Sequence, residues 1–196
     1  SCLPESLRER LRAAELGAPL PAARTGQQYV LYLLRTAYRS RASPSLEVAL
    51  RMAAALDLPL ICVAVVEDGV PADRSWRPTD RAAAFRLEAL RELQPEFATR
   101  GTALWTLVER DGCRPAVAMS VAARAALVVT DEHYGVEPHC SAAARVAQTQ
   151  VPIWMCDCSC TVPSVLLLHT GALSGGNAGF LRATAAAREA RLAQQP

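Results

Sequence analysis

Apolar residues fall into short continuous runs that alternate with longer amphipathic stretches along the chain. Five of these runs have the length and β-branched content of buried strands: residues 29–35, 58–67, 103–109, 125–132 and 151–157. The run LPLICVAVVE at 58–67 is apolar on both faces, as parallel strands are when helices cover both sides of a sheet. The pattern therefore predicts parallel strands buried between layers of helix.

The intervening stretches carry the period and the start signals of helices. The best marked lies at 43–57, where Ser43 or Ser45 can act as N-cap, and where Pro44 and Glu47 suit the first turn. Further helices are predicted at 4–16, at 79–97, from Arg114 onward, near 139–148 and at 180–192. Alternating strands and helices predict an α/β fold, a doubly wound five-stranded parallel sheet of Rossmann-like type with extra N- and C-terminal helices.

The 196 residues, 51% of them apolar, suit one domain with a sizeable core. We divide the chain into an N-terminal helix and linker at 1–28, an α/β domain at 29–163, and a linker with a C-terminal helix at 164–196. Ligands of doubly wound sheets bind outside the carboxyl ends of the strands. The loops to watch therefore follow the first, second and fourth predicted strands.

The net charge of +2 is too small to suggest nucleic-acid binding, so we expect no DNA contact. The sequence contains no lysine, which excludes Schiff-base chemistry and a Walker lysine. No apolar run is long enough to span a bilayer. Because the chain begins at Ser1 without a methionine, we expect an intracellular protein whose targeting peptide has been removed, with a mitochondrion or a chloroplast as candidate locations.

Three of the seven cysteines, Cys156, Cys158 and Cys160, occupy alternate positions in VPIWMCDCSCTVP. If the strand continues, all three lie on one face, with Asp157 and Ser159 on the other. Structural zinc sites favour C-x2-C pairs and need four ligands, so these cysteines are weak metal candidates. We favour the end of a strand with cysteines in a reducing compartment over a metal or redox site.

The fourth predicted strand ends in Thr130-Asp131-Glu132-His133, where a carboxylate beside a histidine could orient a ligand or transfer a proton. We favour instead a solvated loop in which Thr130 or Asp131 caps a turn. A second candidate, the G-x4-G spacing of Gly171 and Gly176, lacks the lysine and hydroxyl of a phosphate loop, because Asn177 and Ala178 follow. We interpret that stretch as a linker before the C-terminal helix.

The order of these segments resembles the N-terminal α/β domain of the photolyase and cryptochrome family, most closely the class II photolyases. The similar segments are YVLYLLRTAYR, SLEVALRMAAALDLPLICVAVV, PTDRAAAFRLEALRELQPEF, ALVVTDEHYGVEPHCSAAARVA and VPIWMCDCSCTVP, and the resemblance covers roughly residues 1–165. It implies an antenna-type crevice near Arg35, Thr36, Thr130 and Asp131. Universal stress proteins and electron-transfer flavoproteins, which have a similar fold, stay open as alternatives.

Two departures from the resembled family shape the functional expectation. Thr36 stands where class II photolyases have an aspartate, and no Asp or Asn precedes the helix. The sequence ends at Pro196, so we expect no helical FAD domain, no FAD and no light-driven repair by this chain alone. The resemblance then implies a non-enzymatic structural or interaction subunit of a larger assembly, with protein partners and no cofactor.

Two other hypotheses stay open. The first is a protein that binds an antenna chromophore or a nucleotide in the strand-end crevice, and the second is a metal or redox role for the cysteines. Trp76 and Trp105 could serve an interface, although core tryptophans are the simpler expectation.

Overall fold

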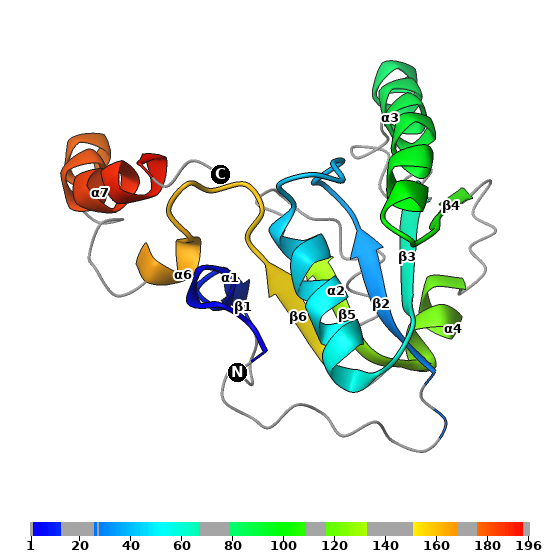
Figure 1. Cartoon of the computed structure of the whole chain (residues 1–196). Coiled ribbons are helices and arrows are strands. Elements are labelled where there is room, and N and C mark those ends of the chain that lie inside the picture. The colour runs from blue at the N-terminus through cyan, green and yellow to red at the C-terminus, as the bar shows by residue number, and fades with distance from the viewer. Residues whose placement is uncertain are drawn as a thin grey trace.

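The computed structural model describes residues 2–12, 26, 28–66, 79–108, 117–132, 151–167 and 176–193. Its centre is a six-stranded sheet of order β1-β6-β5-β2-β3-β4 (Figure 1). The strands are β1 (Leu11–Arg12), β2 (Tyr29–Leu34), β3 (Leu60–Val66), β4 (Leu104–Val108), β5 (Ala125–Asp131) and β6 (Ile153–Cys156). The pairs from β6 to β4 are all parallel, which confirms the doubly wound α/β fold predicted from the apolar runs.

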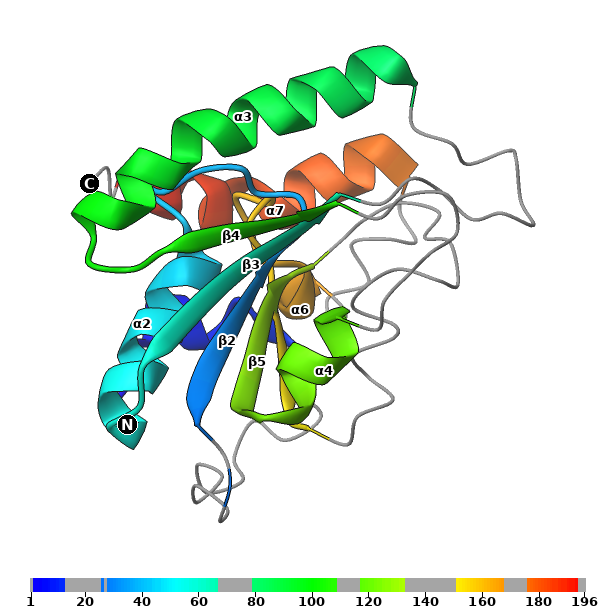
Figure 2. The same ribbon diagram turned by 90° about the vertical axis from the view of Figure 1, so that its right-hand side faces the viewer.

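Helices cover both faces of this sheet, as the apolar strands require. The described helices are α1 (Glu5–Arg8), α2 (Pro44–Leu56), α3 (Asp80–Thr99), α4 (Val117–Ala123), α6 (Ser164–Leu167) and α7 (Gly176–Leu192). Figure 2 shows α2 and α3 on one face and α4 on the other. The helix predicted near 139–148 and the beginning predicted at Arg114 lie outside the described residues.

The first strand, β1, was not predicted, because residues 4–16 have the amphipathic pattern of a helix. That prediction is wrong for residues 9–12, because α1 ends at Arg8 and Leu11 and Arg12 pair antiparallel with Cys156 and Met155 of β6. Its remaining residues, 13–16, lie outside the described part of the chain. Leu11 is fully buried in this arrangement. A short helix gains little stability by itself, so pairing with the exposed edge of β6 outweighs the local helical preference.

The helix α2 begins as the sequence predicts. The Ser43 side chain accepts a hydrogen bond from the backbone N–H of Leu46, and Pro44 occupies the first turn. Ser45 lies one position inside the helix and is fully buried. Its hydroxyl donates to the Asp131 carboxylate at the end of β5, at 2.6 Å, and does not cap the helix.

The core has two parts, one on each face of the sheet. The larger part joins α2 and α3 to the strands and includes Tyr32 of β2 and Phe97 of α3, whose rings stack with centroids 6.5 Å apart. The smaller part lies under α4, around Leu31 and Val128. Because residues on alternating positions of β2 supply both parts, this strand is buried along its whole length.

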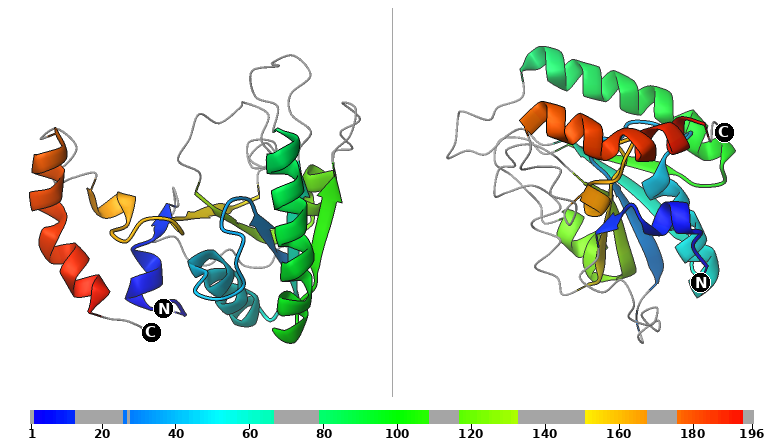
Figure 3. Two further views of the ribbon diagram at one scale, coloured as in Figure 1. Left: turned by 90° about the horizontal axis from the view of Figure 1, so that it is seen from above. Right: turned by 90° about the vertical axis from the view of Figure 1, so that its left-hand side faces the viewer.

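The C-terminal helix α7 begins at Gly176, four residues before the predicted Phe180, so Asn177 and Ala178 are helical. Figure 3 shows α7 beyond α1 at the β1 end of the sheet, while α3 lies at the β4 end. The Arg191 guanidinium contacts the Glu9 carboxylate at 2.8 Å and so ties α7 to the segment after α1. None of the described helices has the length and apolar composition of a bilayer span.

Trp105 of β4 contradicts the simpler expectation of a core tryptophan, because 57% of its surface is exposed. It lies on the last strand of the sheet order, and Val108 of the same strand is also exposed. Trp76 lies outside the described residues. An apolar edge strand is therefore one of the exposed surfaces of the described fold.

Candidate functional site

The candidate site lies at the carboxyl edge of the sheet, where the strand order reverses. The chain passes from β2 to β3 on one side, whereas β5 lies on the other side of β2. Crevices at such reversals are the usual ligand sites of doubly wound sheets. The structure brings the four predicted crevice residues, Arg35, Thr36, Thr130 and Asp131, together at this place, and their binding of a ligand stays a prediction.

Asp131, the last residue of β5, holds the loop that follows β2. Its Oδ2 atom accepts hydrogen bonds from the backbone N–H groups of Arg35, Thr36 and Ala37, each at 3.0 Å. The side chain is fully buried, so the favoured prediction of a solvated loop is wrong for this residue. A carboxylate that accepts several backbone donors fixes the conformation of the loop that supplies them.

The other oxygen of Asp131 joins the core to the first turn of α2. Its Oδ1 atom accepts hydrogen bonds from the Tyr32 hydroxyl at 3.0 Å and from the Ser45 hydroxyl at 2.6 Å. With five donors around it, this carboxylate compensates for its own burial. Asp131 therefore acts as a structural clamp at the carboxyl edge, rather than as a group that faces a ligand.

The two threonines of the predicted crevice differ in their contacts. Thr130 is fully buried, and its hydroxyl donates to the backbone carbonyl of Leu33 at 2.8 Å, so it links β5 to β2. The Thr36 hydroxyl is buried and has no hydrogen-bond partner among the described residues. Among the predicted crevice residues, Thr36 is thus the one whose hydroxyl makes no hydrogen bond within the described part of the chain.

The cysteine segment forms a compact turn instead of a continued strand. The strand β6 ends at Cys156, and the Asp157 carboxylate then accepts from the backbone N–H groups of Ser159, Cys160 and Ser164 at 2.9 to 3.0 Å. The prediction that all three cysteines share one strand face is therefore wrong for Cys160. Among the described residues, no group of three or more His, Cys, Asp or Glu side chains could hold a metal ion.

Arg10 fastens this turn from the other side. Its guanidinium donates to the backbone carbonyls of Asp157 at 3.2 Å and Cys160 at 2.9 Å. Asp157 in turn donates its backbone N–H to the carbonyl of Arg10 at 2.8 Å. The turn is therefore held by one buried carboxylate inside it and one arginine beside it.

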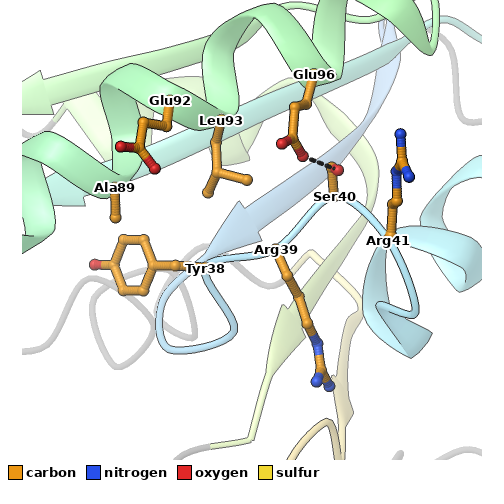
Figure 4. A pocket seen from close by; sticks show the side chains of 8 residues that line it. All are labelled: Tyr38, Arg39, Ser40, Arg41, Ala89, Glu92, Leu93 and Glu96. Atoms are coloured by element: carbon orange, nitrogen blue, oxygen red, sulfur yellow. Dashed lines mark hydrogen bonds between the residues drawn. The ribbon is translucent and has the colours of Figure 1, made fainter.

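A cavity of about 260 Å³ lies between the loop after β2 and the helix α3 (Figure 4). Its lining residues are Tyr38, Arg39, Ser40, Arg41, Ala89, Glu92, Leu93 and Glu96. The Ser40 hydroxyl donates to the Glu96 carboxylate and so joins the two walls. In Figure 4 the Arg39 side chain turns away from α3, and its guanidinium donates to the backbone carbonyl of Cys158.

Sequence reasoning found the loop that borders this cavity but missed most of the residues that line it. The stretch RTAYRSRAS, with an aromatic residue between arginines, was the available signal. Nothing in the sequence placed it beside Glu92 and Glu96, which come from a helix some fifty residues later; Ser40 and Glu96 are 56 positions apart. The contact between Ser40 and Glu96 depends on the packing of α3 against β3 and β4.

The comparison with protein families gives a match to the model described as DNA photolyase over residues 30–183. A curated protein, the deoxyribodipyrimidine photo-lyase of Methanothermobacter thermautotrophicus, is 36% identical over 106 residues, which are 54% of this chain. The matched part spans 22% of that relative's length.

Solved structures of universal stress proteins also align with the chain. One from Burkholderia pseudomallei is 26% identical with a TM-score of 0.38, covering 65% of this chain and 95% of its own. One from Archaeoglobus fulgidus is 14% identical with a TM-score of 0.42, covering 66% of this chain and 95% of its own.

Proposed function

This chain belongs to the DNA photolyase family, and from that premise we propose that its α/β domain binds a planar anionic small molecule at the carboxyl edge of the sheet. The observation that carries the proposal is the cavity of about 260 Å³ between residues 38–41 and α3. An antenna-type chromophore and a nucleotide share the chemistry required, an aromatic ring system with an acidic group. No catalytic step by this domain is part of the proposal.

The rigidity of the cavity wall supports this proposal. The loop that carries Tyr38 begins at the three backbone N–H groups held by Asp131, and Arg39 fastens it to the carbonyl of Cys158. A wall fixed in this way loses little conformational entropy when a ligand binds. The buried clamp thus serves binding indirectly, by shaping the loop.

The lining offers partners for a planar ligand with an acidic group, and two of its side chains, Glu92 and Glu96, are themselves acidic. Tyr38 is half-buried and offers a ring to a stacked partner, while the exposed Arg41 offers a guanidinium to an acidic group. Glu92 can accept hydrogen bonds from ring N–H groups. Phe85, one turn before Ala89 on the same side of α3 and 69% exposed, extends the aromatic surface beyond the cavity.

The cavity volume limits how much of the ligand is enclosed. Small-molecule sites usually enclose roughly 300 to 1,000 Å³, so this cavity holds one ring system and leaves the rest of the ligand outside. The exposed Phe85 and Arg41 then lie where the outer part of the ligand would extend.

The test is mass spectrometry and absorbance spectroscopy of the protein purified from its own cells, followed by titration with FMN, a folate and AMP. We expect one of these classes to bind, and the double variant Tyr38→Ala, Arg41→Ala to weaken its affinity at least tenfold, about 1.4 kcal/mol. Arg51→Ala is the matched control, because Arg51 is exposed on α2 and pairs only with Glu47 among the described side chains. The proposal fails if nothing co-purifies and no titrated molecule binds.

We propose as a second candidate that the domain is a non-catalytic interaction subunit of a larger assembly. The exposed Trp105 and Val108 on the edge strand β4 favour it, because apolar side chains on an edge strand suit contact with another protein. Stoichiometric co-purification with a large assembly, lost in Trp105→Ser, would support this role. Recovery of the protein alone at native concentration would exclude it.

A further inference from the structure

The strand β4 leaves one edge of the sheet open. It is the last strand of the sheet order, and among the described residues it pairs with β3 alone. In Figure 2, which views the molecule from the β4 end of the sheet, no described element lies in front of this strand. Sheet edges are usually protected by charged residues or proline, whereas residues 101–108 contain neither. This edge therefore suits pairing with another strand.

Three residues of β4 turn their backbone N–H and C=O groups toward the open edge: Leu104, Thr106 and Val108. The assignment starts at β3, because the N–H of Val30 in β2 donates to the carbonyl of Pro59. Successive residues of a strand turn these groups to opposite sides, so Pro59 faces β2 and Cys62, three positions on, faces β4. In a parallel pair Cys62 then bonds to the neighbours of Leu104, its partner, and Leu104 itself points outward. The same alternation applies to Thr106 and Val108.

We propose that β4 pairs antiparallel with the β4 of a second copy of this chain, about a two-fold axis at Thr106. Thr106 then lies opposite its counterpart, and Leu104 lies opposite Val108 of the second copy. Opposite residues whose backbone groups face each other form the hydrogen-bonded pairs of an antiparallel ladder, so all three outward residues are paired. An axis at Trp105 or Leu107 would pair only two of the three within the strand. The register at Thr106 therefore satisfies the most backbone groups.

The side chains also match in this register. Trp105, 57% exposed, lies against Leu107 of the second copy at a non-hydrogen-bonded position, where cross-strand side chains come closest. Leu107 is only half-buried beside the smaller core part, so it leaves apolar surface for the Trp105 ring. On the other face of the sheet, the exposed Val108 lies against Leu104 of the second copy. Because β4 carries no charge, pairing two identical strands brings no like charges together.

The Thr106 side chain supplies an independent observation. Its hydroxyl is buried and has no hydrogen-bond partner among the described residues. Threonines that lie opposite each other on paired strands can hydrogen-bond through their hydroxyls, so the counterpart at the axis offers the partner that this hydroxyl lacks. A foreign strand carries a hydroxyl at this position only by coincidence. The unpaired hydroxyl therefore favours a second copy over a foreign strand.

The small size of the paired surface sets the strength of the proposed dimer. Stable complexes bury about 1,200 Å² or more in total. A tryptophan side chain buries at most about 250 Å², so the exposed parts of two Trp105 rings add at most about 300 Å² to the contact of the two strands. We therefore expect a weak dimer, with a dissociation constant of about 10 to 100 μM.

This inference rests on the second proposed function in one respect, the use of β4 as a contact surface, and it names the partner. The two can fail separately. A purified chain that dimerises, while no large assembly co-purifies from cells, keeps the dimer and excludes the assembly. A purified chain that stays monomeric, while an assembly does co-purify, overturns the dimer and leaves the edge to a foreign strand.

The first test measures the mass of the purified full chain by sedimentation equilibrium at about 1 to 300 μM. We expect the average mass to rise from the monomer value of 21.0 kDa toward twice that value. Trp105→Lys and Trp105→Glu should each weaken association at least tenfold. An equimolar mixture of the two should associate more tightly than either variant alone, because the introduced charges lie diagonally across the axis and are then opposite in sign.

The control for these variants is Leu181→Lys, a similar change at an exposed position of α7, and it should dimerise like the wild-type protein. A constant monomer mass for the wild-type protein would overturn the proposal. So would a Trp105→Lys variant that dimerises as tightly as the wild-type protein, or a mixture no tighter than its separate components.

The second test, cross-linking, addresses the register. Thr106→Cys places two thiols opposite each other at the axis, where Cα atoms lie about 5.5 Å apart, within the range that a disulfide bridges. Val108→Cys is the matched control, because its counterpart lies about 13 Å along the paired strand. After mild oxidation and digestion after arginine, Thr106→Cys should yield two disulfide-linked copies of peptide 101–110, which has no native cysteine. Val108→Cys should yield at least tenfold less, and equal yields would overturn the proposed pairing.

Discussion

The Tyr32 hydroxyl donates a hydrogen bond to the Asp131 carboxylate at 3.0 Å across two adjacent strands, and neither side chain is exposed to solvent. The contact joins a neutral phenol to a buried charge. Burial raises the pKa of Tyr32 well above its ordinary value, and the charge of Asp131 raises it further. The folded phenol therefore keeps its proton to higher pH than an unfolded tyrosine does, so the stability of the fold depends on pH in alkaline solution.

Alkaline pH should unfold the protein through Tyr32. An unfolded tyrosine ionises near pH 10, whereas the folded one holds its proton to higher pH, so above about pH 10 the unfolded chain binds fewer protons. The contribution of Tyr32 to the free energy of unfolding is therefore complete below about pH 10 and is lost as the pH rises further. Urea unfolding between about pH 8 and pH 11 should show a steeper decline for the wild-type protein than for Tyr32→Phe. Equal slopes would contradict the assignment.

Asp131→Asn should destabilise the fold by about 2 to 4 kcal/mol. The asparagine amide has one acceptor oxygen and one NH2 donor group. If the NH2 group replaces Oδ2, it faces three backbone N–H donors, and if it replaces Oδ1, it faces the Tyr32 and Ser45 hydroxyls that now donate to that oxygen. Asp80→Asn, an exposed change in the first turn of α3, is the control and should cost about 0.5 kcal/mol. Equilibrium urea unfolding of both variants measures the difference, and similar midpoints would refute the clamp.

Arg10→Gln should loosen the cysteine turn and lower the free energy of unfolding by about 2 kcal/mol. Two backbone carbonyls, those of Asp157 and Cys160, lose a charged donor. The control is Arg51→Gln, which removes only an exposed pair with Glu47 and should cost about 0.3 to 0.5 kcal/mol. If both variants lose the same small amount, Arg10 does not anchor the turn.

Ala42→Gly should stabilise the protein, although glycine usually destabilises. Ala42 has φ of 47°, in the left-handed region where a Cβ atom costs about 1 kcal/mol. Relief of that strain should give a gain of about 0.5 to 1 kcal/mol, reduced in part by the greater freedom of the unfolded chain. The same substitution at Ala84, exposed within α3, should instead cost about 1 kcal/mol. Thermal unfolding shifts of opposite sign are the expected result.

The strands could be predicted because each is apolar along most of its length, and a run such as LPLICVAVVE has few other interpretations. The cap of α2 was equally local, with Ser43 and Pro44 adjacent in the sequence. The strand at Leu11 and Arg12 was not predicted, because its partner β6 is remote in the sequence. The exposure of Trp105 was not predicted, because the sequence does not show which strand lies at the edge of the sheet.

The site was predicted in position but not in role. The rule for doubly wound sheets led to Asp131, yet its burial and its five donors depend on Tyr32 and Ser45, 99 and 86 positions away. Cys156 and Cys158 could be placed near a strand end, but the turn around Asp157 that separates Cys160 from them depends on Arg10, 147 positions away. Local patterns locate such residues, and long-range packing gives them their partners.

The pairing of β1 with β6 has a consequence for how the chain reaches its final form. Leu11 and Cys156, which are 145 positions apart, must meet before this pair closes, and contacts of such sequence separation form slowly. Until then the outer edge of β6, with Met155 and Cys156, presents open backbone hydrogen-bonding groups beside apolar side chains. Pairing with the two residues of β1 covers this edge, so a chain shortened past Arg12 should aggregate at lower concentrations than the full chain.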